Sequence, residues 1–118
     1  MKPAYYEKNH EGFEGDHFLA DKVKSLIDQF KIKWVDVNLK TCNIDLDDLE
    51  RKLSPTTRVV ILVHWGGTPV DLERIESIKK KYYEMYGKRL LVIEDCAHCW
   101  NSKIGQQLIG NSGNYCVF

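Results

Sequence analysis

Two stretches of the chain are continuously apolar, a pattern that predicts buried strands. One is Val59–Val63, which is mostly β-branched, and the other is Leu90–Ile93. Strands in a parallel sheet are covered on both faces, so they lack the alternation of polar and apolar residues that half-exposed strands show. We therefore expect two parallel strands, over 58–64 and 89–94, that are buried on both faces.

The segment between these strands has the pattern of an amphipathic helix. Apolar residues recur from Leu72 to Tyr86 at spacings of three and four, Asp71 is placed to cap the helix, and Gly87 is placed to end it. One helix between two parallel strands makes a βαβ unit, which is right-handed in nearly all proteins. The expected fold class is α/β, with a mainly parallel sheet and covering helices.

The N-terminal third carries weaker patterns. Residues 1–15 have no apolar period and predict an arm or loop. Apolar residues at helical spacing predict a helix over 17–30 with Asp16 as its N-cap, and alternation over 33–37 predicts a half-buried strand. We expect an arm and helix over 1–30, and a second region over 31–118 that holds the βαβ unit.

Three further segments complete the predicted order of elements. A short helix is expected to begin near Asp45 and to end before Pro55, and residues 64–69 are expected to form a tight loop. The last four residues, 115–118, have the pattern of the opening of another buried strand. An autonomous domain rarely finishes inside an apolar strand, so the sequence favours a fragment over a short natural edge strand.

Composition and charge exclude several classes of protein. Apolar residues make up 43% of the 118 residues, enough for a packed core, and 17 Lys and Arg balance 17 Asp and Glu. This zero net charge disfavours a protein that binds nucleic acid or an anionic membrane through its general field. No apolar run reaches the ~20 residues that span a bilayer. The four cysteines are too few and too unevenly spread for a disulfide scaffold, so we expect a cytoplasmic protein.

Polar residues follow both predicted strands, where ligands collect in parallel α/β sheets. His64–Gly67 follows the first strand, and Glu94 and Asp95 end the second. An acid held at the end of a rigid strand can bind a metal, act as a base, or pair with a protonated ring nitrogen of a cofactor. It can also simply cap the turn that follows, and position alone does not separate these roles. Successive side chains of a strand point to opposite faces, so Glu94 and Asp95 lie on different faces of the sheet. We expect Asp95 to face an open crevice beside the His64–Gly67 loop.

Cys96, Ala97, His98 and Cys99 form a CxxC motif. A zinc site needs a second pair of ligands, and a thioredoxin-like redox pair needs a helix N-terminus after the motif. His64 is one further candidate ligand, but the sequence has no second CxxC motif. We therefore expect buried, unreactive thiols, no disulfide and no metal site.

Five ordered segments resemble the sugar aminotransferases of the DegT/StrS type, which are pyridoxal-phosphate (PLP) enzymes of the aspartate-aminotransferase fold. They cover about three quarters of the chain, and residues 1–30 do not share the resemblance. Each segment matches a family motif in order and spacing. The segments are 34–50 (a DVDP…NIDP…LE run), 54–58 (TPRTKAI), 64–71 (H-x-x-G-x-P-x-D), 93–98 (IEDAAQ/H) and 105–118 (G…G-x-x-G…CFSF).

The resemblance implies roles for two residues. Asp95 matches the carboxylate that pairs with the pyridine nitrogen of PLP and keeps it protonated, so that the ring acts as an electron sink. His98 matches the Gln or His that lies near the phenolic oxygen of the cofactor, although a purely structural hydrogen bond is the alternative for this side chain. The implied fold is part of the large domain of a PLP-dependent transferase. The implied reaction moves an amino group from an amino acid, with glutamate the expected donor, to a nucleotide-linked keto sugar in a homodimeric parent.

The family's Schiff-base lysine follows the strand that matches Cys116–Phe118, so no lysine between 1 and 118 is expected at that place. The chain alone is therefore expected to be inactive and to bind PLP weakly or not at all. The same family includes PLP-dependent sugar dehydratases, in which a histidine replaces the lysine. Two hypotheses from different classes stay open: a truncated remnant that binds a partner chain, and a small metal- or redox-binding domain that uses Cys96, His98 and Cys99.

Overall fold

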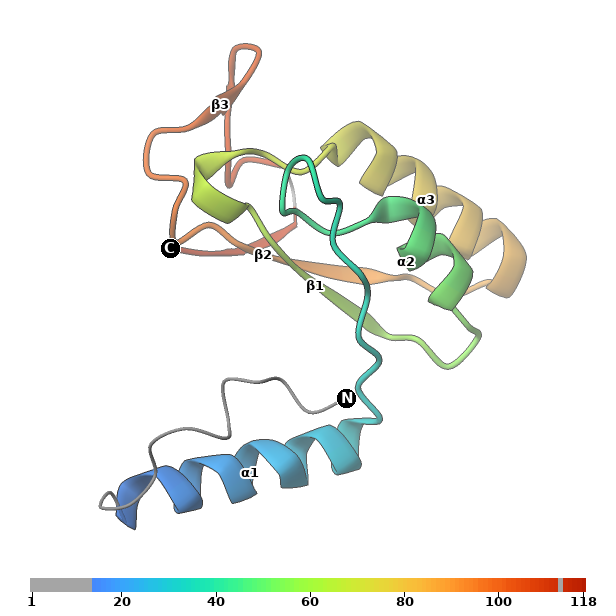
Figure 1. Ribbon diagram of the computed structural model, residues 1–118. Helices are drawn as coiled ribbons and strands as arrows, with labels where there is room; N and C mark the ends of the chain where they lie inside the picture. Colours follow the sequence, from blue (N-terminus) through green and yellow to red (C-terminus); the bar gives the residue numbers. More distant parts are fainter. Residues whose placement is uncertain (1–13, 113) are drawn as a thin grey trace. The chain divides into compact units, whose positions relative to one another are not determined.

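The computed structural model describes residues 14–112 and 114–118, and the chain divides into two compact units, Met1–Trp34 and Val35–Phe118 (Figure 1). The described part of the first unit is the helix α1 (Glu14–Phe30) and the short segment after it. Because α1 begins at Glu14, Asp16 lies inside the first turn and does not act as the expected N-cap. Most of the expected arm, residues 1–13, lies outside the described residues.

The second unit is built on a three-stranded parallel sheet with the order β1-β2-β5. The strands are β1 (Val59–Val63), β2 (Leu91–Asp95) and β5 (Tyr115–Val117), and α3 (Leu72–Tyr86) connects β1 to β2. The register aligns Val63 of β1 with Asp95 of β2 and Val117 of β5. The predicted parallel strands, the helix between them and the α/β fold class are confirmed.

Both helices of this unit begin and end where their capping residues predict. Asp45 accepts hydrogen bonds from the first turn of α2 (Leu46–Lys52), and the Oδ1 atom of Asp71 accepts one from the Arg74 N–H at 3.0 Å. At the other end of α3, Gly87 adopts φ 63°, a left-handed conformation that favours glycine, and its N–H donates to the Tyr83 carbonyl. The local sequence therefore fixes the length of each helix.

The helices α2 and α3 cover one face of the sheet, where the core lies (Figure 1). Val60, Leu62 and Val92 are buried against apolar side chains of both helices, among them Ile75 and Tyr82. The alternate residues of the strands lie on the other face, and most of them are exposed. The exposed ones are Val59, Ile61, Val63, Leu91, Tyr115 and Val117. The expectation of strands buried on both faces is therefore wrong, because both helices lie on the same side.

The predicted strand over 33–37 is also absent. Only Val37 forms a β-bridge, an antiparallel one with Ile44, across a tight turn in which the Asn38 N–H donates to the Asn43 carbonyl at 2.8 Å. Trp34 is 72% exposed. The alternating sequence has no neighbouring strand among the described residues, and alternation without a partner does not make a strand.

The sequence patterns did not predict a small hairpin that projects after β2. Its strands, β3 (Lys103–Ile104) and β4 (Gln107–Leu108), pair antiparallel across a two-residue turn in which Gly105 has φ 58°. Strands of two residues are too short to show a period. The expected loop at 64–69 is present, with a single 3₁₀ turn, η2 (Trp65–Gly67), at its start.

Candidate functional site

Asp95 lies at the carboxyl end of the middle strand, as its place in the sequence predicts. It is the last residue of β2, half-buried, on the face of the sheet that carries no helix. Its Oδ1 atom accepts a hydrogen bond from the Ala97 N–H at 3.0 Å, which fixes the orientation of the carboxylate. Its Oδ2 atom has no hydrogen-bond partner within residues 14–112 and 114–118. Asp95 thus caps the following turn and still offers one anionic oxygen to a ligand.

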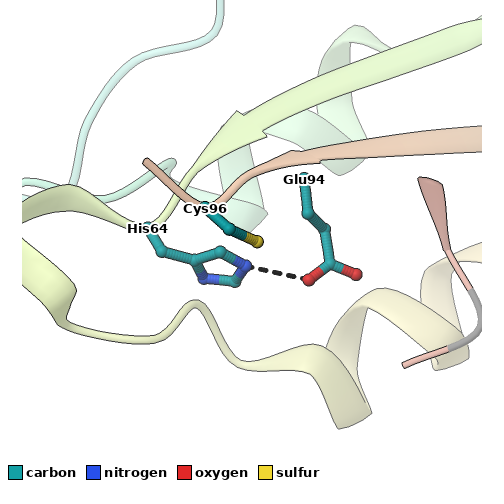
Figure 2. A group of neighbouring side chains, drawn as sticks. All are labelled: His64, Glu94 and Cys96. Atoms are coloured by element: carbon teal, nitrogen blue, oxygen red, sulfur yellow. Dashed lines mark hydrogen bonds and ion pairs between the residues drawn. The ribbon is translucent and has the colours of Figure 1, made fainter. Parts of the chain in front are cut away.

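Glu94 points to the opposite face, where its side chain is fully buried and hydrogen-bonds to His64 (Figure 2). Its Oε2 atom lies 2.9 Å from Nε2 of His64, and its Oε1 atom accepts bonds from the Ser112 hydroxyl and from Nδ2 of Asn114, the latter at 2.8 Å. Burial raises the pKa of Glu94, but the three hydrogen bonds outweigh it and hold the pKa below its usual range. Glu94 is therefore an anion that is saturated by protein donors.

The side chain of His64 is also fully buried, and both of its ring nitrogens are used. Nδ1 lies 3.0 Å from the Val70 N–H, and a backbone N–H can only donate, so Nδ1 carries no proton. The ring proton must then be on Nε2, which donates it to Glu94. The geometry assigns a neutral imidazole with one defined tautomer.

Three hydrogen bonds, two to Asn43 and one to His98, hold the segment Trp65–Thr68 next to His98. The Trp65 N–H donates to Oδ1 of the buried Asn43, and Nδ2 of Asn43 donates to the Thr68 carbonyl, both at 2.8 Å. At the tip, the Gly66 N–H donates to Nδ1 of His98 at 3.2 Å. The His98 ring also packs edge-on against Trp65, with ring centroids 5.4 Å apart. His98 is thereby oriented with its Nε2 atom available as a donor.

Glycine is required at position 67 of this segment. Its φ of 77° lies in the left-handed region, and a Cβ atom there would approach the His98 carbonyl oxygen to 3.0 Å. The close approach of the two loops that follow β1 and β2 therefore depends on the absence of a side chain.

Three buried ligand-type atoms, from His64, Glu94 and Cys96, lie within 4.8 Å of one another (Figure 2). Metal binding there would require a thiolate and a free imidazole nitrogen. Burial, followed by the neighbouring Cys116 and Glu94, raises the pKa of the Cys96 thiol to about 12, and both nitrogens of His64 are engaged. His64 and Glu94 therefore belong to a hydrogen-bond network with Val70, Ser112 and Asn114, and Cys96 is a buried thiol beside it. Among the described residues, the ligand atoms of Cys96, His98 and Cys99 do not gather into a group close enough to hold a metal ion.

The same environment predicts the reactivity of the cysteines, all four of which are free. Burial raises the pKa of Cys96, Cys99 and Cys116, whereas Cys42 is exposed. We expect one fast-reacting thiol, Cys42, when the native chain is titrated with a thiol-specific disulfide reagent at neutral pH, because only the thiolate reacts. Titration in denaturant without reductant is expected to find four thiols, and Cys42→Ser is expected to remove the fast phase. Fast reaction of a second thiol would show that the cluster around Cys96 is open.

The structure brings Asp95 and His98 to the same end of the sheet, as expected. The supporting residues Asn43, Ser112 and Asn114 were not predicted as part of the site. Each lies in a polar, loop-forming stretch where nothing in the local sequence distinguishes a buried amide or hydroxyl from an exposed one. Their roles depend on contacts with residues between 18 and 25 positions away.

Comparison with known proteins gives a consistent result. The model of the DegT/DnrJ/EryC1/StrS aminotransferase family matches residues 28–118. GDP-perosamine synthase of Escherichia coli O157:H7 is 29% identical over 89% of this chain and 29% of its own length. The dTDP-3-amino-3,6-dideoxy-alpha-D-galactopyranose transaminase of Aneurinibacillus thermoaerophilus is 33% identical over 71% of this chain and 22% of its own length. Sugar aminotransferase CalS13 from Micromonospora echinospora superposes with a TM-score of 0.69 at 46% identity, over 72% of this chain and 23% of its own. The chain spans between 20% and 29% of the length of the curated relatives it matches.

Proposed function

Because this chain belongs to the DegT/DnrJ/EryC1/StrS aminotransferase family, we propose that it forms part of the PLP site of an enzyme that transfers an amino group to a nucleotide-linked keto sugar. The two curated relatives described above are named for GDP-linked and dTDP-linked amino sugars, which supports this class of acceptor. Glutamate is the donor that we propose. The four free cysteines favour a reducing compartment, the cytoplasm. None of the described helices is long and apolar enough to cross a membrane.

The observation that carries the proposal is the position of Asp95. PLP has a basic pyridine nitrogen, and a carboxylate beside that nitrogen holds it protonated. Asp95 fits this role, because one of its oxygens is fixed by the Ala97 N–H and the other has no partner among the described residues. PLP, when bound, supplies a positively charged ring that accepts the electrons released at the substrate carbon. Asp95 supplies the negative charge that favours this state of the ring.

His98 fits a second contact. Its Nδ1 atom accepts from the Gly66 N–H, so a neutral His98 has its proton on Nε2, which can donate a hydrogen bond to an anionic phenolic oxygen. We propose that Asp95 and His98 bind two different polar atoms of one aromatic ring, the ring nitrogen and the phenolic oxygen. Trp65 restricts the rotation of the His98 ring and thereby keeps this donor in one direction.

The test is an assay of the protein that carries this chain, loaded with PLP and supplied with ¹⁵N-glutamate and GDP- or dTDP-linked 4-keto-6-deoxy sugars. We expect ¹⁵N to appear in an amino sugar. A product that has lost a hydroxyl group and gained no nitrogen would instead indicate the dehydratase activity of the same family. Binding of neither PLP nor sugar would favour the non-catalytic remnant.

A further inference from the structure

We propose that Glu94 and His64 are positioning residues, which act through the Trp65–Thr68 segment to orient His98 beside Asp95. They do so as a buried anion and a neutral imidazole with its proton on Nε2. The importance of this arrangement rests on the function proposed above. The arrangement itself can be tested without cofactor or substrate.

The pair connects the two loops that approach the candidate site. Glu94 immediately precedes Asp95, so a rigid Glu94 side chain fixes the strand end from which Asp95 projects. Its three donors come from outside β2, one from the end of β1 and two from the turn that leads into β5. A single carboxylate therefore links the carboxyl ends of β1 and β2 to the segment before β5, from the buried side of the sheet.

His64 connects the rigid end of the sheet to the loop that contains Trp65–Thr68. Its backbone follows β1, and its side chain accepts the Val70 N–H six residues later, so one imidazole joins both ends of the segment that includes Trp65–Thr68. Between these ends, Gly66 donates to His98. If the His64 proton moved to Nδ1, the Val70 N–H would face another donor and the loop would lose its anchor. The acceptor on Glu94 prevents this change, because it favours the proton on Nε2.

Among the described residues, the titratable and charged groups near Glu94 and His64 do not compete for the proton on Nε2 of His64. Cys96 and Cys99 follow β2 and Cys116 lies on β5, and burial keeps all three as thiols. On α3, Nζ of Lys79 donates to Oδ1 of Asn114 at 2.8 Å, and Nδ2 of Asn114 in turn donates to Glu94. Lys79 also forms an ion pair with Glu76 at 2.6 Å, so its charge is already partnered on α3.

The experiment is ¹⁵N NMR of the histidine rings in the full chain, together with amide hydrogen exchange at Val70 and Gly66. In the unaltered chain at about pH 8, where a free histidine is neutral, we expect His64 to show a protonated Nε2 and an unprotonated Nδ1. Glu94→Gln can keep its oxygen toward His64 and its NH₂ toward the Ser112 hydroxyl, which can also accept, so it is expected to keep this pattern. Glu94→Ala removes the acceptor and is expected to give a mixture of tautomers at His64 and His98, with exchange at Val70 faster by about tenfold or more. Val92→Ala, on the same strand and face, is the matched control: it creates a cavity in the core but is expected to leave both tautomers unchanged.

Two results would overturn the proposal. One is a proton on Nδ1 of His64 in the unaltered chain, which needs no variant to be measured. The other is a change at His98 in Val92→Ala as large as in Glu94→Ala, because the effect would then reflect general loss of packing. If Glu94→Ala does not fold, the comparison between the unaltered chain and Glu94→Gln still decides. Loss of the His64 pattern in a folded Glu94→Gln would also contradict the proposal. Failure of the amino-transfer assay would leave these NMR results unaffected, so the two proposals can fail separately.

Discussion

Replacing Asp95 with asparagine is expected to lower amino transfer by the protein that carries this chain by roughly 10²–10³-fold, the range found when one preorganised charge-stabilising group is removed. The asparagine has the same shape and keeps an oxygen for the Ala97 N–H, so the turn after β2 should be preserved. It has no negative charge, so it does not favour a protonated ring nitrogen. The loss should therefore appear mainly in kcat.

Two controls make this result specific. Glu84→Gln, at an exposed position on α3, also removes one negative charge and is expected to leave activity unchanged. The free energy of unfolding of Asp95→Asn, measured in urea, should stay within about 0.5 kcal/mol of the unaltered protein. Full activity in Asp95→Asn would mean that another acid contacts the ring. Glu94, saturated by its three donors, is a poor candidate for that role.

The second large effect is expected at the centre of the core. Leu62 is 1% exposed and packs between the sheet and its helices. The preceding residue, Ile61, lies on the opposite face and is 67% exposed. Leu62→Ala is expected to reduce the free energy of unfolding by about 2–5 kcal/mol, because it removes buried surface and leaves a cavity. Ile61→Ala should cost less than about 1 kcal/mol, mostly through lower β-propensity.

Urea denaturation of the two variants of the 118-residue chain measures this difference directly. The pair differs by one position and has the same type of substitution, so the contrast reports on which face of β1 is packed. Equal losses at both positions would show that the second face of the sheet is covered in solution.

The sequence was sufficient to predict the βαβ unit because each of its elements carries its own local information. Val59–Val63 has β-branched residues, and α3 has a capping Asp71 and a terminating Gly87. It was not sufficient to predict how many faces of the sheet are covered. An apolar residue such as Ile61 looks the same in sequence whether or not a helix packs on it. The same limit explains the error at 33–37, where alternation was present but a pairing strand was not.

For the candidate site, motif resemblance and strand-end position are enough to predict Asp95 and His98. The structure adds their orientation, which depends on contacts distant in sequence. Asn43 holds the Trp65–Thr68 segment from more than twenty residues upstream, and no periodicity links them. Buried polar networks of this kind follow from the packed fold, so the local sequence does not predict them.

Whether Asp95 is the partner of the PLP ring nitrogen is tested most directly by ¹⁵N NMR of PLP labelled at that nitrogen. In the unaltered protein that carries this chain, we predict the chemical shift of a protonated pyridine at neutral pH. In Asp95→Asn, we predict the shift of an unprotonated one. An unprotonated nitrogen in the unaltered protein, or a protonated nitrogen in both proteins, would contradict the assignment of Asp95.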